Sequence, residues 1–317
     1  MVFMATQQIR ETDIKSCLAF DPETTRHEII EFIRKSADTL KKPGVVIGIS
    51  GGLDSSVVAY LCKEALGDEN ILGLILPERD TDPRNTEDGI NLVKGLGIPY
   101  EKIDITPIIR GLGTYDLFSE EETTSRTAMQ RAIEHMKKIT GKESAFAGSF
   151  GRIYAPHEDT ENLEYINKMH AFMTAKTRVR MMTLYYHAIL RNYLVAGTDD
   201  RSERTIGFYD RYGDGACDIS VISHLYKTQI KTLAAHIGVP DHIVNKPSSH
   251  DLWGMSMPNE NIIGLTYEKL DSVLCGVRLG LSDSEIATSV GVSPDMIKSI
   301  KRAIESEKVR RSMPFSL

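Results

Sequence analysis

The sequence predicts an α/β protein in which a doubly wound parallel sheet carries a helical appendage and one inserted segment. Short apolar runs, VVIGIS at 45–50, ILGLILP at 71–77 and YLVAGT at 193–198, are typical of buried strands. Between them lie longer segments whose apolar residues recur at helical spacing. Strands that alternate with helices in this way usually form a parallel sheet with helices on both faces.

The first half of the chain supplies most of the expected elements. Apolar residues at helical spacing predict a helix over 24–42, which Pro43 and Gly44 terminate. The strand at 45–50 follows, and then a helix from Ser55 to Ala65. After the strand at 71–77 we expect a helix over 85–96 and a third strand, YEKIDI, at 100–105.

The second half repeats the pattern and adds two irregular regions. A helix over about 166–192 leads into the strand at 193–198, and the α/β unit extends to about residue 245. Residues 113–165, with mixed charge, glycines and one helical stretch (Arg126 to Lys138), are interpreted as an insertion or lid. Residues 260–308 predict a helical appendage. We expect residues 1–317 to form a single domain.

The composition excludes several classes of function. The 317 residues are 41% hydrophobic and 26% charged, and the formal net charge of −6 gives no general attraction to nucleic acid or membranes. No apolar run is long enough to span a bilayer, and the amino terminus does not resemble a secretory signal. The cysteines are scattered, which argues against a zinc site or disulfide framework. We therefore expect a cytoplasmic protein without nucleic-acid or membrane partners. The four cysteines are Cys17, Cys62, Cys217 and Cys275.

The motif SGGLDSS, which follows the first strand, predicts a phosphate-binding loop. Glycines that allow close approach, next to the start of a helix, form a nest of backbone amides for anions. The lysine-bearing G-x-x-x-x-G-K-[ST] loop is absent. Instead Asp54 offers a carboxylate, which is useful beside phosphate only if a cation lies between them, and this implies Mg²⁺. The predicted ATP-binding loop consists of Ser50, Gly51, Gly52, Leu53, Asp54, Ser55 and Ser56.

This loop resembles that of the N-type ATP pyrophosphatases, a Rossmann-like superfamily whose S-G-G-x-D-S motif holds the β- and γ-phosphates while ATP is cleaved between α and β. Later blocks resemble the NAD synthetases in particular. They are KTRVRM at 176–181, AGTDDRSERTIGFYDRYGDGACD from 196, NKPSSHDLW at 245–253 and GLTY at 264–267. The resemblance covers roughly residues 25–315.

The resemblance implies roles for individual residues. Asp54 and Glu203 match the metal-binding carboxylates, so Mg²⁺ is expected with ATP as co-substrate. Thr198, Lys227 and Ser249 match nucleotide-contacting positions. Positions that hold the second substrate, nicotinate adenine dinucleotide (deamido-NAD), are matched by Arg178, Arg211, Asp218, Val309 and Arg310.

The implied reaction forms the amide of NAD in two steps. The nicotinate carboxylate attacks the α-phosphorus of ATP, pyrophosphate leaves, and ammonia then displaces AMP from the adenylate. The protein positions the substrates and stabilises charge, so no side-chain nucleophile is needed. A glutaminase module is not expected in this chain, which uses free ammonia or receives it from a separate protein. NAD synthetases resemble one another in being homodimers, and we expect one here.

Several departures from the family pattern leave the acceptor open. The family's lysine before Y-G-D-G is Arg211, its H-K pair is Val309 and Arg310, and GMSMPNE replaces its acidic run after DLW. One alternative is therefore a paralogue that adenylates another carboxylate or carbonyl compound. A second alternative is a DNA-binding regulator, because two helices joined by GVSP in the appendage resemble a helix-turn-helix. Against it, the second helix opens with Pro294, Asp295 and Met296 rather than basic or amide residues.

Overall fold

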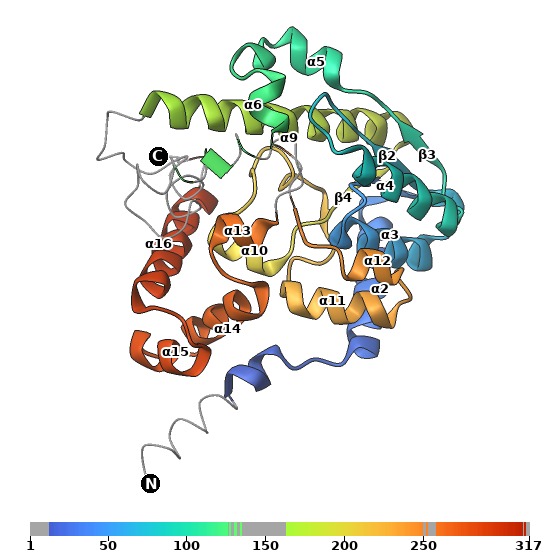
Figure 1. Cartoon of the computed structure of the whole chain (residues 1–317). Coiled ribbons are helices and arrows are strands. Elements are labelled where there is room, and N and C mark those ends of the chain that lie inside the picture. The colour runs from blue at the N-terminus through green and yellow to red at the C-terminus, as the bar shows by residue number, and fades with distance from the viewer. Residues whose placement is uncertain are drawn as a thin grey trace.

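A parallel sheet of five strands forms the centre of the protein in the computed structural model (Figure 1). The structure describes residues 13–125, 163–249 and 258–312, together with positions 127, 130, 131, 134, 252 and 314. The strand order is β3-β2-β1-β4-β5, and every pair is parallel. The strands are β1 (Val45–Gly48), β2 (Ile71–Ile75), β3 (Tyr100–Lys102), β4 (Leu194–Gly197) and β5 (Ile219–Ser220).

One face of the sheet is covered by α2, α3, α4, α11 and α12. Val45 and Ile47 of β1 point into this layer, where Ile33 and Val57 are also completely buried. Because strand residues alternate between faces, Val46 belongs to the core on the other side. The helices of the first face are α2 (Pro22–Leu40), α3 (Leu53–Leu66), α4 (Pro83–Leu96), α11 (Lys227–His236) and α12 (Asp241–Val244).

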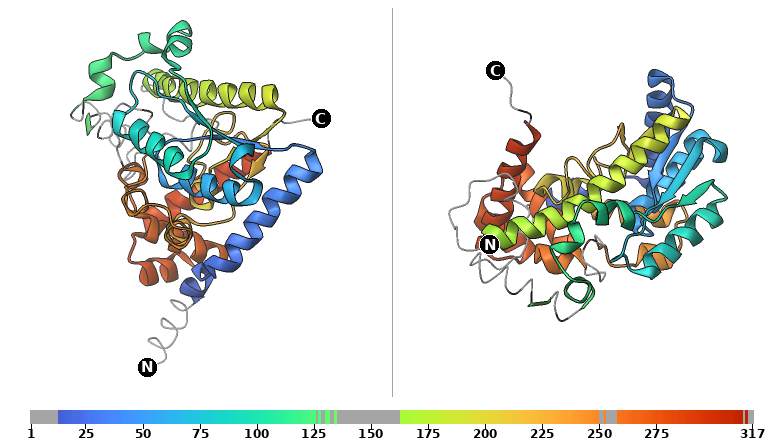
Figure 2. Two further views of the ribbon diagram at one scale, coloured as in Figure 1. Left: turned by 90° about the vertical axis from the view of Figure 1, so that its right-hand side faces the viewer. Right: turned by 90° about the horizontal axis from the view of Figure 1, so that it is seen from above.

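The long helix α9 (Leu163–Arg191) connects the sheet to a second group of helices. Its carboxyl-terminal part packs with α5 (Thr106–Gly111) on the second face of the sheet, through Val179 and Ala188. Its amino-terminal part contributes Met169 and Phe172 to a different core. Figure 2 shows α9 running from beside the carboxyl-terminal helices to the strands. One helix therefore belongs to both cores.

The carboxyl-terminal helices pack around this second core, on the side of the molecule away from β3 (Figure 1). Ile286, Ile297 and Ile300 are buried there, so the two segments that resemble a helix-turn-helix pack their apolar faces inside the protein. The comparisons below do not favour the DNA-binding alternative. The carboxyl-terminal helices are α13 (Asn259–Ile263), α14 (Tyr267–Arg278), α15 (Asp283–Val290) and α16 (Pro294–Arg311), and α10 (Arg201–Ile206) contributes Ile206 to the same core.

The fold class predicted from the sequence is confirmed, with local differences. The strands are shorter than the apolar runs, and α3 begins at Leu53 instead of Ser55. A fifth strand, β5, was not predicted, because two residues carry no recognisable periodicity.

Part of the predicted insertion lies outside the described residues, including most of the helical stretch from Arg126 to Lys138. Its described beginning contains η2 (Thr114–Asp116) and α6 (Glu120–Thr124), after the short η1 (Asp68–Asn70) earlier in the chain. Within the described ranges, no helix combines the length and the apolar character that crossing a membrane requires.

Candidate active site

The candidate site lies where the strand order reverses, beyond the carboxyl ends of β1 and β4. The chain leaves β1 toward β2 on one side, and β4 continues the sheet on the other. In open parallel sheets, ligands bind in the crevice at this switch point. Residues 49–52 follow β1 and residues 198–200 follow β4, which brings two motifs about 150 positions apart in the sequence to the same edge.

The loop after β1 is shaped by a glycine that no other residue could replace without strain. Gly51 has φ +73°, and a Cβ at this position would lie 2.2 Å from the carbonyl oxygen of Asn85. Gly52 then caps α3, and no side chain accepts a hydrogen bond at this cap. The first-turn amides of α3 are thus directed toward any anion bound there.

The serines of the loop fix its shape. The hydroxyl of Ser56 donates to the carbonyl of Gly52 at 2.7 Å, and the hydroxyls of Ser50 and Ser55 lie 3.0 Å apart. Ser50 also accepts from the Gly52 amide at 3.2 Å. These contacts hold the loop in place before any nucleotide arrives.

A pocket of about 280 Å³ opens beside the loop. Apolar residues such as Leu76 and Leu184 line one part of it, and Arg180 lies among them. Of the residues predicted for ATP and the metal, eight line the pocket: Ser50, Gly52, Leu53, Asp54, Ser55, Thr198, Glu203 and Ser249.

Next to the loop lies a buried lysine surrounded by three carboxylates, here called the Lys227 cluster. Lys227 Nζ lies 2.6 Å from Asp200 Oδ2, 2.7 Å from Asp54 Oδ2 and 3.1 Å from Glu203 Oε1. The lysine is 4% exposed. If all four groups are ionised, the cluster carries a formal charge of −2, since three anions face one cation.

Three helix starts bring these side chains together. Asp54 is in the first turn of α3, and Lys227 is the first residue of α11. Asp200 caps α10, where its Oδ1 accepts from the amide of Glu203 at 2.7 Å. Because these three helix starts meet at the same sheet edge, the carboxylates lie close together around Lys227.

Neutral donors also hold Glu203. Its Oε1 accepts from the Tyr267 hydroxyl at 2.5 Å and from the Asn259 amide at 3.1 Å. Both donors come from the carboxyl-terminal helices, whose packing therefore contributes to the geometry of the site.

The charges of the Lys227 cluster are strongly coupled. Burial raises the pKa of Asp54, an effect that Lys227 opposes and Glu203 reinforces. Burial and the neighbouring Glu203 raise the pKa of Asp200 well above its ordinary value. Burial alone would lower the pKa of Lys227, but the three carboxylates outweigh it and raise that pKa well above its usual range. Negative charge is thus in excess here.

The cluster fits a divalent cation. One oxygen from each of Asp54, Asp200 and Glu203 can be chosen so that all three lie within 4.8 Å of one another. Carboxylate oxygens are the ligands that Mg²⁺ prefers. Asp54 Oδ1 is also buried without a hydrogen-bond partner among the described residues, so it is available to a ligand.

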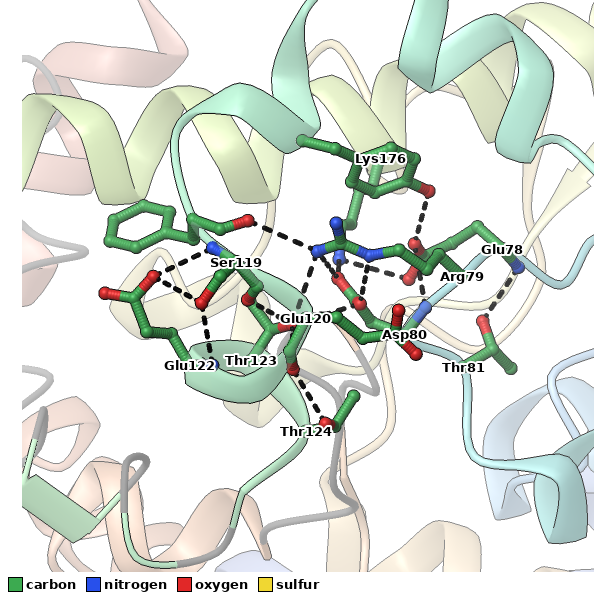
Figure 3. A network of polar contacts seen from close by, with 12 residues as sticks. Glu78, Arg79, Asp80, Thr81, Ser119, Glu120, Glu122, Thr123, Thr124 and Lys176 are labelled. Carbon is green, nitrogen blue, oxygen red and sulfur yellow. Dashed lines mark hydrogen bonds and ion pairs between the residues drawn. The ribbon is translucent and has the colours of Figure 1, made fainter.

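A second buried lysine, Lys176, lies in a different kind of network, here called the Lys176 cluster (Figure 3). Its Nζ is 2.6 Å from Asp80 Oδ2 and 3.1 Å from Glu78 Oε1, and it donates to the Leu252 carbonyl at 2.9 Å. Arg79 pairs with Asp80 at 2.7 Å. The two carboxylates therefore face two cations.

The Lys176 cluster connects three parts of the chain. The Tyr115 hydroxyl donates to Glu78 at 2.8 Å, and the Thr123 hydroxyl donates to Asp80 at 3.0 Å. Although burial opposes it, pairing with Arg79 and Lys176 lowers the pKa of Asp80. The network thus ties the beginning of the insertion and helix α9 to the loop after β2.

Residues predicted for the second substrate lie outside the pocket lining. Arg178 pairs with Asp210 at 3.0 Å, and Asp218 accepts from the Val195 amide at 2.8 Å. Arg211 donates to the carbonyl of Arg310. Their roles in binding the dinucleotide stay predictions.

The two residues of the tail pair predicted for the dinucleotide differ in exposure. Arg310 is 2% exposed, donates to the carbonyls of Gly207 and Tyr209, and pairs with Glu307 at 3.0 Å. Val309 is half exposed. The Arg310 guanidinium therefore braces the chain after α10, and its role in binding the dinucleotide stays a prediction.

Four residues near the loop were not singled out from the sequence. Asp200, Asn259 and Tyr267 join the Lys227 cluster or hold it, and Lys246 donates to the Gly51 carbonyl at 3.1 Å. Asp200, Lys246 and Tyr267 stand inside motifs used for the resemblance, AGTDDRSER, NKPSSHDLW and GLTY. Their position inside these motifs was the sequence signal that could have identified them as site residues.

Sequence comparison agrees with the geometry of the site. The family model for NAD synthase matches residues 25–140 and 117–314. An NH(3)-dependent NAD(+) synthetase of Coprothermobacter proteolyticus is 38% identical over 83% of this chain and 87% of its own length. One from Thermotoga neapolitana is 36% identical over 92% of this chain and 96% of its own length.

Solved structures show the same fold. The NH3-dependent NAD synthetase from Campylobacter jejuni, in complex with the nitrate ion, superposes with a TM-score of 0.64. It is 25% identical, and the match covers 94% of this chain and all of that one. The NMN synthetase from Francisella tularensis, at 24% identity and a TM-score of 0.67 over 94% of this chain and 99% of that one, shares the fold.

Proposed function

This chain belongs to the NAD synthase family, and we propose that it catalyses the ATP-dependent amidation of deamido-NAD with ammonia. The enzyme is a ligase that forms a carbon–nitrogen bond and yields NAD, AMP and pyrophosphate. The observation that carries the proposal is the meeting of the glycine loop and the Lys227 cluster at the switch point. Its relatives are named for the same reaction, which favours deamido-NAD over other acceptors.

In the first step a carboxylate oxygen of deamido-NAD attacks the α-phosphorus of ATP. The bond from the α-phosphorus to the bridging oxygen breaks, and pyrophosphate leaves. The amides at the start of α3, with Ser50, Ser55 and Ser56, hold the departing phosphates. Thr198 and Ser249 line the same pocket and contact the nucleotide.

Asp54 and Glu203, together with Asp200, would hold Mg²⁺. The ion would supply positive charge that stabilises the negative charge developing on the leaving group. Lys227 is close enough to the same region to bind a phosphate oxygen with its ammonium. The protein thereby stabilises the departing pyrophosphate without a covalent intermediate on a side chain.

In the second step ammonia attacks the acyl carbon of the adenylate, AMP leaves with the carboxyl oxygen bound to phosphorus, and the nitrogen loses a proton. Arg178, Arg211 and Asp218 are proposed to orient the dinucleotide, with Val309 and Arg310 nearby. The guanidinium groups of Arg211 and Arg178 lie 5.5 Å and 5.9 Å from the centre of the Tyr212 ring. Free ammonia or a separate glutaminase supplies the nitrogen.

The enzyme acts as a homodimer through the outer face of α9. Met182, Tyr186, Ile189 and Leu190 recur at helical spacing there and are 51–76% exposed. Such an apolar stripe is unusual on a monomer. Light scattering should therefore report a dimer whose dissociation constant rises at least tenfold in Ile189→Glu. A wild-type monomer would contradict this assignment.

Two further expectations accompany the activity. The chain functions as a single domain, because α9 contributes to both cores. We place it in the cytoplasm, since the described cysteines are free thiols, which suits a reducing compartment. Most of the segment 113–165, expected as an insertion or lid, lies outside the described residues, and its role at the site stays a prediction.

The test of the activity is product formation. Purified protein with ATP, Mg²⁺, deamido-NAD and an ammonium salt should release pyrophosphate and AMP and form NAD in equal amounts. Omission of deamido-NAD or ammonia should stop NAD formation. If pyrophosphate release depends instead on another carboxylate, that carboxylate would be the acceptor in place of deamido-NAD.

A further inference from the structure

The ammonium of Lys227 occupies the space that a divalent cation would need. Its Nζ lies 2.6–3.1 Å from oxygens of Asp54, Asp200 and Glu203, the same three residues that can hold a metal ion. A metal bound to these oxygens would lie about 2 Å from each. Two cations cannot share so small a space at acceptable electrostatic cost.

The three carboxylates do not need the lysine to keep their positions. Asp200 is held by the Glu203 amide, and Glu203 by the Tyr267 hydroxyl and the Asn259 amide. Asp54 is in the first turn of α3, where the hydroxyls of Ser55 and Ser56 donate to the carbonyl of Gly52. The lysine side chain, by contrast, has four rotatable bonds, so its ammonium can leave while its backbone stays in place.

The charge count favours an exchange. Among the described residues, the ion pairs of Asp54, Asp200 and Glu203 are all with Lys227. When all three carboxylates are ionised, one ammonium leaves two negative charges uncompensated, whereas a divalent ion would leave one. The lysine is therefore an incomplete substitute that a divalent cation can displace if the ammonium finds another anion.

Resting on the proposed metal site, we propose that Lys227 is a resident counter-ion that occupies the cation position in the nucleotide-free enzyme and competes with the metal ion for it. The phosphates of the nucleotide give the displaced ammonium its new partner. Metal and nucleotide then strengthen each other's binding. The metal displaces the ammonium from the carboxylates, and the phosphates bind the displaced ammonium. The free enzyme consequently binds divalent cations weakly.

The experiment measures Mn²⁺ binding to the protein without nucleotide, by the loss of the free Mn²⁺ signal in electron paramagnetic resonance. We expect Lys227→Met to bind Mn²⁺ at least about tenfold more tightly than wild type, because an occupied site lowers apparent affinity by its occupancy. Adding Asp54→Asn to that variant should remove the gain. Lys176→Met, a matched change in the Lys176 cluster, should leave Mn²⁺ affinity unchanged.

A second pair of variants tests the same proposal if Lys227→Met folds poorly. Asp200→Asn and the double variant Asp200→Asn with Lys227→Met keep the same carboxylates and differ only in the lysine. The double variant should again bind Mn²⁺ more tightly. Equal or weaker affinity after removal of the lysine in both backgrounds would overturn the proposal, as would a gain that survives loss of Asp54.

The result is independent of the proposed reaction. Mn²⁺ binding is measured without substrates, and wild-type turnover of deamido-NAD is measured separately. If Lys227 competes with Mn²⁺ but the protein does not form NAD, the counter-ion role of Lys227 stands. Only the assignment of deamido-NAD as the acceptor is then wrong.

Discussion

Lys176 and Lys227 are both buried lysines that face carboxylates, yet the two clusters have opposite electrical character. Glu78 and Asp80 face Lys176 and Arg79, so charges balance and the pKa of Asp80 is lowered. Around Lys227, three carboxylates face one cation, and burial among like charges raises the pKa of Asp54 and Asp200.

The difference separates a structural network from a binding site. Both lysines are buried, so burial alone does not distinguish them. The balanced cluster can contribute to folding, because breaking a buried pair leaves an uncompensated charge. The unbalanced cluster retains negative charge that only a further cation neutralises. Charge imbalance beside a phosphate-binding loop is therefore the informative observation.

The largest expected effect concerns catalysis. Asp54→Ala and Glu203→Ala should each lower kcat for pyrophosphate release by about a hundred- to a thousandfold or more, because charge on the leaving group loses its stabilisation. Circular dichroism should show an intact fold. Asp80→Asn, from the balanced cluster, is the control and should lose far less activity. Full activity of Asp54→Ala would refute the metal assignment.

The next effect concerns folding. Lys176→Met removes the cation between Glu78 and Asp80 and should lower the free energy of unfolding by about 3–5 kcal/mol. Denaturant titration measures the change. Adding Asp80→Asn should restore part of the loss, since one stranded charge disappears. Unchanged stability of Lys176→Met would show that the cluster does not support the fold.

Conservative amide substitutions should have opposite signs in the two clusters. Without metal, Asp54→Asn should raise the free energy of unfolding by about 1 kcal/mol, since a carboxyl with a raised pKa is costly to ionise. Asp80→Asn should lower it by about 1–3 kcal/mol, because it removes a paired charge. Thermal melts at pH 7, in buffer that contains a chelator, measure the change in stability of each variant. The same sign for both would contradict the contrast.

The smallest effect is the response to acid. The pKa of Asp80 is lower in the folded protein than in the unfolded chain, so its stabilisation is complete above about pH 4. It is lost as the pH falls through the folded value. Wild type should therefore lose about 1 kcal/mol more stability than Asp80→Asn below pH 4. Parallel acid curves would mean that Asp80 is not paired in solution.

The sequence predicted those parts of the fold that periodicity and turn residues determine. Three apolar runs and the segment YEKIDI located four of the five strands, and SGGLDSS located the loop. Helix ends were less accurate, because the start of α3 at Leu53 depends on the cap at Gly52. The two residues of β5 were too few to detect.

Residues of the site could be predicted only where they match a functional position of a recognised motif. Asp200 went unrecognised because it becomes part of the cluster through the cap of α10 and not through a spacing. Lys176 and Asp80 are 96 positions apart, and their pairing depends on how α9 crosses the sheet. The burial of Arg310 against Gly207 and Tyr209 likewise depends on how α16 packs. Pairings of this kind follow from tertiary packing, which local patterns do not specify.

The most direct measurement is a crystal structure with Mn²⁺ and a non-hydrolysable ATP analogue, with data collected at the manganese absorption edge. The anomalous peak should lie about 2.2 Å from carboxylate oxygens of Asp54 and Glu203, with the phosphates over the glycine loop. Lys227 should have moved from the carboxylates to a phosphate oxygen. A peak between Glu78 and Asp80, or one that Asp54 and Glu203 do not contact, would contradict the account.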